Sequence, residues 1–411
     1  MRIFLKIVLL VAVVLLVVSY EGKTDQRTKA ERSASYIGRT GTHINENSAL
    51  PRNFRERRPD SIMRRDIPQR EMRGNVPPPD LEEIRRQRNI ERSANTEWLR
   101  ESTKRYSPDS WYLLMSYDSL PASSLAPLLN GGVVTSQKTT ETFEYLRGRT
   151  RIDLLASMEL NVHELAHAYF DQNVFQYLIE NNIGFNPDNA NGFIYISPYQ
   201  SYFISFPLKA MFPSAELAEV IPSNLRTYRY DTYINGTTST QSDGVIGLLN
   251  ELHAYYCGTR YCFDMLEPYK TAAGSDASGL FEWVTHTQST MSAFYEFDFF
   301  ISEYLLFMKR KHPADYELLR SYRPFRESYV TLKKLYKDLI DRYLDRINKE
   351  AGLLNASGES QARLSDGWLW IRSGKSHISS GTPLFSDERK ILLPVLEGRR
   401  YREIRDDFEM N

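Results

Sequence analysis

Helical periodicity is the feature of this sequence that most constrains its fold. From about residue 142 to residue 181, apolar side chains recur near every 3.6 positions, the spacing that gives a helix one apolar face. Residues 280–311 are so apolar that we expect a helix through the core, and residues 326–349 predict an amphipathic helix. Two further helices are predicted over residues 80–104 and 243–258, each with an aspartate at its start. We therefore expect a mainly α protein.

Short strands are expected between these helices. Residues 110–121 and 131–137 are bounded by Pro, Gly and Ser, and each predicts a strand. Residues 192–197 and 201–206 alternate or run apolar, and they predict a strand pair. The chain has 411 residues, 41% hydrophobic and 25% charged, which is the composition of a soluble globular protein able to bury a sizeable core. The expected fold class is α+β, mainly α, with a small sheet.

The composition divides the chain into four parts. Residues 1–20 carry two basic residues ahead of an apolar run that is shorter than the roughly 20 residues of a membrane span. They predict a signal peptide, with a retained N-terminal anchor as the alternative, and in either case a protein exported from the cytoplasm. Residues 21–78 are rich in Arg, Ser, Asn and Pro and predict a disordered basic linker or pro-segment. Residues 79–350 form the expected main domain, and residues 351–411 a C-terminal appendage.

Charge and cysteine content exclude several classes of protein. Lys plus Arg and Asp plus Glu are equal at 52 each, which argues against a general binder of nucleic acid or of anionic membranes. Membrane contact is then expected only through an uncleaved N-terminal segment. The two cysteines, Cys257 and Cys262, either close a small disulfide loop or are two buried thiols. They lack the spacing of a four-cysteine zinc site.

The stretch "MELNVHELAHAYFD", residues 158–171, combines chemistry with the predicted helix. It places His163 and His167 four residues apart in a chain that has seven histidines. Side chains at i and i+4 share one face of a helix, so both imidazoles can reach one point about 2 Å from each ring nitrogen. Glu164 lies on the flank of that face, where it can take a proton from a water molecule held by a metal ion. The stretch therefore predicts two metal ligands and a general base.

A catalytic zinc ion usually takes three protein ligands and leaves a fourth position open. The third candidate is Glu251 in "LLNELHAYYCG", which follows the pattern L-N-E-x-x-A-x-Y. Together with "VHELAH", this stretch resembles the gluzincin metallopeptidases, in which two histidines of H-E-x-x-H and a glutamate of a later helix bind zinc. The resemblance covers about twenty residues of 411. It implies a zincin-like fold for residues 79–350, Zn²⁺ as cofactor, ligands His163, His167 and Glu251, and Glu164 as general base.

The chain departs from the family in two ways. A stretch of 83 residues, 168–250, separates His167 from Glu251, which is longer than in the thermolysin-like or M1-type branches. The G-x-M-E-N segment with which M1-type enzymes hold a free amino terminus is absent upstream. The resemblance therefore favours an endopeptidase, or a branch that is not assigned, over an aminopeptidase.

Four neighbours of the two motifs have alternative roles. Tyr255, four residues after Glu251, is a catalytic candidate that can donate to an oxyanion, or else a core residue. Glu159 and Asp171 extend the histidine face by one turn each way, either as partners of the outer imidazole nitrogens or as solvated and capping residues. His253 points away from Glu251 on a helix and is expected to be structural.

Acidic residues also interrupt the apolar stretch 280–311. An unpaired carboxylate there would be costly, so Glu296, Asp298 and Glu303 are expected to pair with arginines. Glu296 or Glu303 is the reserve third ligand if Glu251 is not one, and His286 is a weaker reserve.

The sequence thus predicts an exported zinc metallopeptidase that acts on a peptide or protein substrate, with no nucleic-acid partner. The alternative is a non-catalytic zincin-like protein, at a surface or in the periplasm, whose metal site only stabilises a binding or interaction domain. Retention of Glu164 favours the enzyme, because a purely structural zinc site has little use for a base and is more often closed by four protein groups.

Overall fold

The structure is a computed structural model, and it describes residues 81–374 and 379–409. The chain divides into two compact units, Met1–Glu91 and Arg92–Asn411. Of the first unit only residues 81–91 are described, so the predicted signal peptide and basic linker lie outside the described residues. Among the described residues, no helix is both long and apolar enough to cross a membrane.

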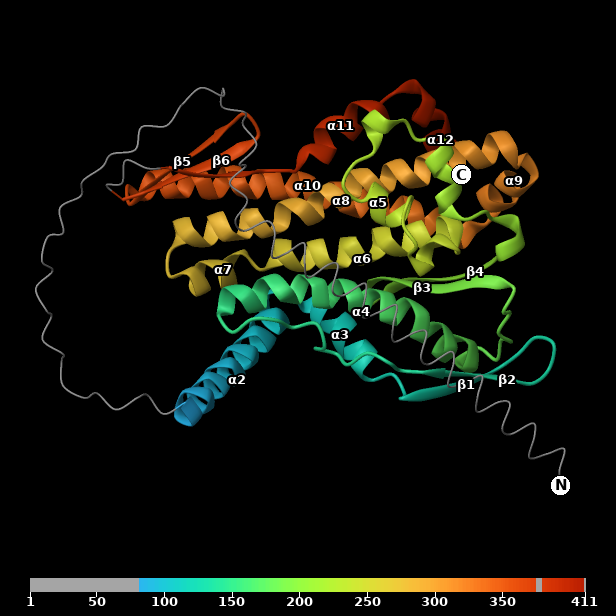
Figure 1. Cartoon of the computed structure of the whole chain (residues 1–411), viewed down its shortest axis with the longest axis horizontal. Helices are drawn as coiled ribbons and strands as arrows, with labels where there is room; N and C mark the ends of the chain where they lie inside the picture. Colours follow the sequence, from blue (N-terminus) through green and yellow to red (C-terminus); the bar gives the residue numbers. More distant parts are fainter. Residues whose placement is uncertain (1–80, 375–378, 410–411) are drawn as a thin grey trace, which may run out of the picture. The chain divides into compact units, whose positions relative to one another are not determined.

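Helices make up most of the described chain (Figure 1). The longest are α8 at 36 residues, α10 at 35 and α4 at 30. The α-helices are α2 (Leu81–Tyr106), α3 (Pro108–Asp118), α4 (Arg151–Glu180), α5 (Tyr230–Tyr233), α6 (Gly244–Asp264), α7 (Leu266–Ala273), α8 (Asp276–Lys311), α9 (Pro313–Ser321), α10 (Arg323–Ser357), α11 (Asp387–Leu396) and α12 (Arg399–Glu409). Four short 3₁₀ helices are described between β4 and α6: η1 (Leu208–Ala210), η2 (Ser214–Glu219), η3 (Ser223–Leu225) and η4 (Ser239–Gln241).

The described strands form three small antiparallel sheets. The first pairs β1 (Ser123–Pro127) with β2 (Val133–Gln137), and the second pairs β3 (Asn189–Ser197) with β4 (Gln200–Pro207). The third has the order β5 (Ser360–Ser365), β6 (Trp368–Ser373) and β7 (Ser380–Pro383). A mainly α fold with short strands is therefore confirmed, although its strands belong to three separate sheets.

The core of the second unit lies among four long helices. In Figure 1, α4, α6, α8 and α10 run side by side, and α6 packs against each of the other three. Each helix contributes apolar side chains that are fully buried, among them Leu165, Leu249, Phe297 and Leu339. Burying one such side chain stabilises the fold by about 1.5–3 kcal/mol. The two motif helices, α4 and α6, are thus held in direct contact at the centre of the molecule.

Helix α4 begins at a capping box. The Thr150 hydroxyl accepts a hydrogen bond from the backbone N–H of Asp153, and the Asp153 carboxylate accepts one from the backbone N–H of Thr150. This reciprocal pair satisfies two of the amides that a helix start leaves open. The prediction that this helix begins near residue 142 is therefore wrong by about nine residues, because the cap sets the start at Arg151.

Two other sequence predictions are corrected. Residues 110–121 do not form a strand, because α3 spans Pro108–Asp118, with proline in its first turn and a buried face at Ser110, Leu113, Leu114 and Tyr117. That spacing of three and four residues is the helical one. Helix α6 does not end at Gly258 but continues to Asp264.

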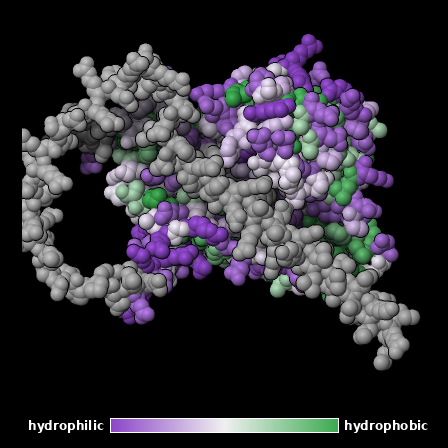
Figure 2. Space-filling view, viewed as in Figure 1, coloured by the Kyte–Doolittle hydropathy of each residue, from purple (hydrophilic) through white to green (hydrophobic). Residues whose placement is uncertain are grey.

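The surface agrees with this arrangement. On the face shown in Figure 2, hydrophilic residues cover most of the described surface, and apolar residues form small patches between them. Most apolar residues of the long helices are buried in the core, and Ile179 of α4 and Leu353 of α10 are among the exposed ones.

Candidate metal centre

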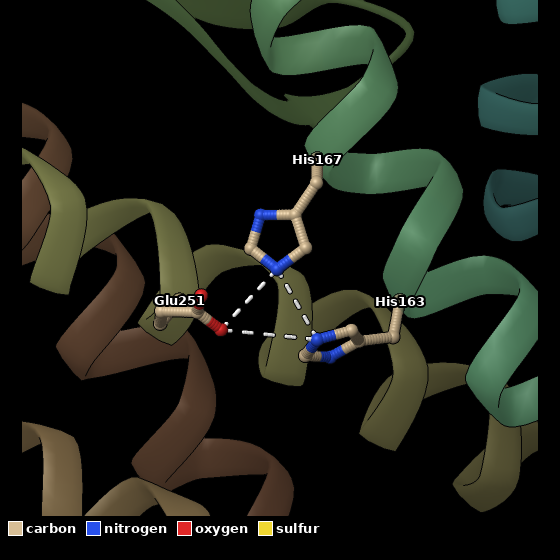
Figure 3. Close-up of side chains that lie close together, drawn as sticks. All are labelled: His163, His167 and Glu251. Atoms are coloured by element: carbon tan, nitrogen blue, oxygen red, sulfur yellow. Dashed lines mark hydrogen bonds and ion pairs between the residues drawn. The ribbon is translucent and has the colours of Figure 1, made fainter. Parts of the chain in front are cut away.

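Helices α4 and α6 bring three metal-binding side chains to one point. The Nε2 atoms of His163 and His167 lie 3.2 Å apart, and Oε2 of Glu251 lies 3.2 Å from Nε2 of His167 and 3.8 Å from Nε2 of His163 (Figure 3). Among the described residues, these three form the group of His, Cys, Asp and Glu side chains placed to hold a metal ion.

The spacing of these atoms fits a tetrahedral metal ion. Ligand atoms about 2.0–2.1 Å from a tetrahedral zinc ion lie about 3.3 Å from one another. Two of the three separations are within about 0.1 Å of that value and the third exceeds it by about half an ångström. Two imidazoles and one carboxylate are also a donor set that suits zinc. The residues present therefore fit the metal that the sequence predicts.

The burial of the three candidate ligands favours a bound cation. His163 is 4% exposed, His167 is 8% exposed and Glu251 is fully buried. A carboxylate with no access to water is costly unless a positive charge or hydrogen bonds compensate it. A cation held at the shared point would add to that compensation.

Asn250 orients one of the histidines. Its Oδ1 atom lies 3.0 Å from Nδ1 of His167, and both side chains are buried. An amide oxygen can only accept, so Nδ1 of His167 carries the proton and Nε2 keeps its lone pair for a metal. Asn250 belongs to the motif "LLNELHAYYCG", but the motif alone predicts no role for it. Its position directly before the glutamate was the available signal.

Glu164 follows His163 in α4 and is 7% exposed. Its place in the chain puts it on the flank of the histidine face.

Tyr255 is brought to the centre, as its spacing from Glu251 predicts. Its ring centroid lies 4.4 Å from that of His163, with the planes at 69°. Its hydroxyl oxygen lies 3.3 Å from that of Tyr233, which comes from α5. Burial raises the pKa of both phenols, and the nearby Arg229 opposes the rise. Tyr233 and Arg229 are not among the residues expected from the sequence, where nothing distinguishes Tyr233 among the 26 tyrosines of the chain.

The two acidic neighbours on α4 differ in position. Asp171 is exposed, in line with a solvated role. The Glu159 carboxylate instead lies at the contact between α4 and α6. Its Oε1 atom is 2.6 Å from the position that a Cβ atom added to Gly258 of α6 would take. Burial raises the pKa of Glu159 to about 7 against the effect of Arg229, and Glu164 adds to the rise.

His253 has a structural place, as predicted. Its Nε2 lies 2.8 Å from the backbone carbonyl oxygen of Tyr195 in β3, to which it donates a hydrogen bond. Full burial lowers the pKa of His253 to about 3, so the ring is neutral at physiological pH. Arg260 donates to the next carbonyl, that of Ile196. Helix α6 thus occupies this part of the β3 edge.

The reserve ligands lie elsewhere and have their own partners. Glu296 pairs with Arg229, and Glu303 accepts hydrogen bonds from Arg400 and Tyr401. Asp298 pairs with Lys333 rather than with an arginine. His286 contacts the Tyr269 hydroxyl. The arginine pairing predicted for the acidic residues of this helix is confirmed for Glu296 and Glu303.

The cysteines are free thiols. Cys257 and Cys262 are both buried in α6 and form no disulfide. Residues five apart on a helix point in different directions, so a bond between them would require the helix to unwind.

Comparisons with known proteins give no relative of this chain. No protein-family model, no curated protein and no solved structure matches it.

Proposed function

We propose that this protein is a zinc-dependent hydrolase of the gluzincin type that cleaves peptide bonds, with His163, His167 and Glu251 as the zinc ligands. One observation carries the proposal, namely the near-tetrahedral spacing of three candidate ligand atoms from two helices, although 83 residues of the sequence lie between His167 and Glu251. Three protein ligands leave the fourth position for water, which is the arrangement of catalytic rather than structural zinc sites.

The residues around the zinc ion have separate tasks in this proposal. When bound, zinc supplies a Lewis acid that polarises a carbonyl and lowers the pKa of a water molecule. Glu164 takes a proton from the attacking water and returns it to the leaving amine. Asn250 keeps His167 in the tautomer that binds metal. Peptides are the proposed substrates because the pair of motifs resembles metallopeptidases, and export is proposed from residues 1–20.

The burial of the centre favours a second candidate. His163, Glu164 and His167 are 4%, 7% and 8% exposed, which leaves little room for an extended peptide to reach Glu164. A non-catalytic zincin-like protein, in which the metal only holds α4 against α6, has no need of that room. The two candidates share the ligands and differ in the role of Glu164.

Metal analysis and one substitution separate the candidates. Purified protein should hold about one equivalent of zinc, and His163→Ala should lose it. Glu164→Gln should keep the zinc and abolish the cleavage of a mixed library of fluorescence-quenched peptides. Glu180→Gln is the matched control, because Glu180 is an exposed glutamate at the far end of α4. A metal-free wild type would refute the zinc site, and zinc-loaded wild type with no cleavage would select the non-catalytic candidate.

A further inference from the structure

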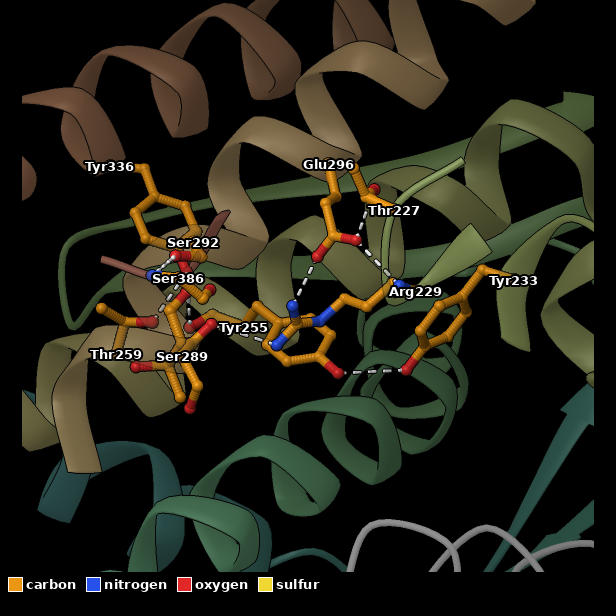
Figure 4. A network of polar contacts seen from close by, with 11 residues as sticks. Thr227, Arg229, Tyr233, Tyr255, Thr259, Ser289, Ser292, Glu296, Tyr336 and Ser386 are labelled. Carbon is orange, nitrogen blue, oxygen red and sulfur yellow. Dashed lines mark hydrogen bonds and ion pairs between the residues drawn. The ribbon is translucent and has the colours of Figure 1, made fainter. Parts of the chain in front are cut away.

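Arg229 is a buried arginine beside the metal centre. It is 3% exposed, and its guanidinium pairs with the Glu296 carboxylate and donates to the Ser289 carbonyl oxygen (Figure 4). The centre of the guanidinium lies 4.5 Å from the ring centroid of Tyr255. A charge buried at this depth requires partners, and those partners fix it in one place.

Glu296, a residue of α8, accepts hydrogen bonds from the segment that carries Arg229. One carboxylate oxygen accepts hydrogen bonds from the Thr227 hydroxyl at 2.7 Å and from the backbone N–H of Arg229 at 2.8 Å. The other oxygen accepts from the Arg229 guanidinium. Glu296 is fully buried, so these bonds hold residues 227–229 in one conformation. Tyr233 follows four residues after Arg229, in the short helix α5.

Tyr255 lies between these residues and the metal ligands. Its ring contacts the His163 ring. The same ring lies against the Arg229 guanidinium, and its hydroxyl meets that of Tyr233 (Figure 4). It stands four residues after Glu251 in α6, on the same face of the helix. The Tyr255 ring therefore borders the metal point on the His163 side, and the Glu251 carboxylate acts electrostatically on the Tyr255 hydroxyl.

We propose that Tyr233, Arg229 and Glu296 are positioning residues that hold the Tyr255 hydroxyl as a hydrogen-bond donor to the oxyanion of a ligand in the metal centre. The proposal rests on the proposed function and assigns to that site three residues outside both sequence motifs. Its ligand class is an oxygen anion, such as the one that forms when water adds to a peptide carbonyl.

Two effects strengthen the Tyr255 hydroxyl as a hydrogen-bond donor. A guanidinium over the face of a phenol draws electron density from the ring, which makes the hydroxyl a stronger donor. The Tyr233 hydroxyl can donate to the Tyr255 oxygen, and this leaves the Tyr255 proton for the ligand and strengthens its hydrogen bond. An oxyanion is stabilised best by hydrogen-bond donors that are already fixed at the position where its charge develops.

Two small probes test the proposal without any substrate. Acetohydroxamate binds a metal through anionic oxygens that accept hydrogen bonds, whereas imidazole binds through nitrogen and offers no such acceptor. Their affinities are measured on the full chain substituted with cobalt(II), by titration of its visible absorption. Tyr255→Phe should weaken acetohydroxamate about tenfold or more, the usual effect of losing a hydrogen bond to a charged group, and should leave imidazole unchanged. Tyr233→Phe should weaken acetohydroxamate about threefold, with imidazole again unchanged.

Matched variants separate positioning from stability. Tyr230→Phe removes the hydroxyl of another buried tyrosine of α5 and should change neither affinity. Arg229→Met should weaken acetohydroxamate, and Arg229→Lys should restore part of the affinity. Equal affinities for acetohydroxamate in wild type, Tyr233→Phe and Tyr255→Phe would overturn the proposal, as would a loss of imidazole affinity of the same size. Both results still leave the zinc site and the role of Glu164 standing, whereas a wild type that binds no metal removes both proposals.

Discussion

The sharpest prediction concerns Asn250, which contacts the proposed zinc ligand His167 through Nδ1 and not through Nε2. Asn250→Ala removes the acceptor 3.0 Å from Nδ1 of His167 and leaves a buried N–H unpaired. Leaving such a donor unsatisfied costs about 1–3 kcal/mol. Loss of an outer partner of a metal ligand typically lowers metal affinity by about 10–100-fold, which corresponds to about 1.4–2.7 kcal/mol. The two estimates agree, so we expect a zinc dissociation constant about 10–100 times that of wild type.

Competition with a chelator of known zinc affinity measures this change. The control is Asn161→Ala, because Asn161 is also buried but bonds to the backbone of Tyr145 and Thr142 instead of to a ligand. It should lower the melting temperature without changing zinc affinity by more than about twofold. Asn250→Asp keeps an acceptor and should retain most of the affinity. Wild-type zinc affinity in Asn250→Ala, or an equal loss in Asn161→Ala, would refute the orientation of His167 by Asn250.

Three other predictions concern the helices that carry the site. Gly258→Ala places a Cβ atom 2.6 Å from Oε1 of Glu159 and forces that carboxylate to move, so in chemical denaturation it should lack the gain of about 1 kcal/mol expected of Gly352→Ala in α10, which meets nothing within 4 Å. Burial raises the pKa of Glu159 from its ordinary value of 4.5 to about 7, so the folded state binds a proton that the unfolded state has released, and wild type loses stability as the pH rises through that window. Glu159→Gln should therefore be more stable than wild type at pH 8 and lose that advantage below about pH 5, and a pH-independent difference would contradict this sign. Cys257 and Cys262 should resist a thiol reagent in the native protein and both react in guanidinium without a reductant, so fewer than two reactive thiols would disprove the free-thiol state.

The candidate ligands could be predicted because their spacing is local or part of a short pattern. His163 and His167 need only a helix to share a face, and Glu251 was selected by the residues next to it. The partners that complete the site could not be predicted. Tyr233 and Arg229 reach the centre only because Glu296 of α8 holds their segment, and no local pattern encodes that pairing.

The errors in the fold have local physical causes. Residues 110–121 are rich in aromatic and apolar residues, which favoured a strand, but Ser107 and Pro108 start a helix whose buried face has helical spacing. Gly258 predicts a helix end, because glycine often follows one. Its actual role is a close approach, since the Glu159 carboxylate occupies the space of a side chain there.

The long interval between the two motifs would make the stability of the protein depend on the zinc available to it. An unfolded chain offers the two histidines of one motif, and the third ligand joins them only after 83 intervening residues have folded back. Zinc bound at this centre would therefore stabilise the native state relative to every unfolded or partly unfolded state. The free energy of unfolding would rise with the logarithm of the free zinc concentration. The lifetime of this protein would then follow the zinc content of its surroundings, and scarcity of the ion would remove the protein as well as its activity.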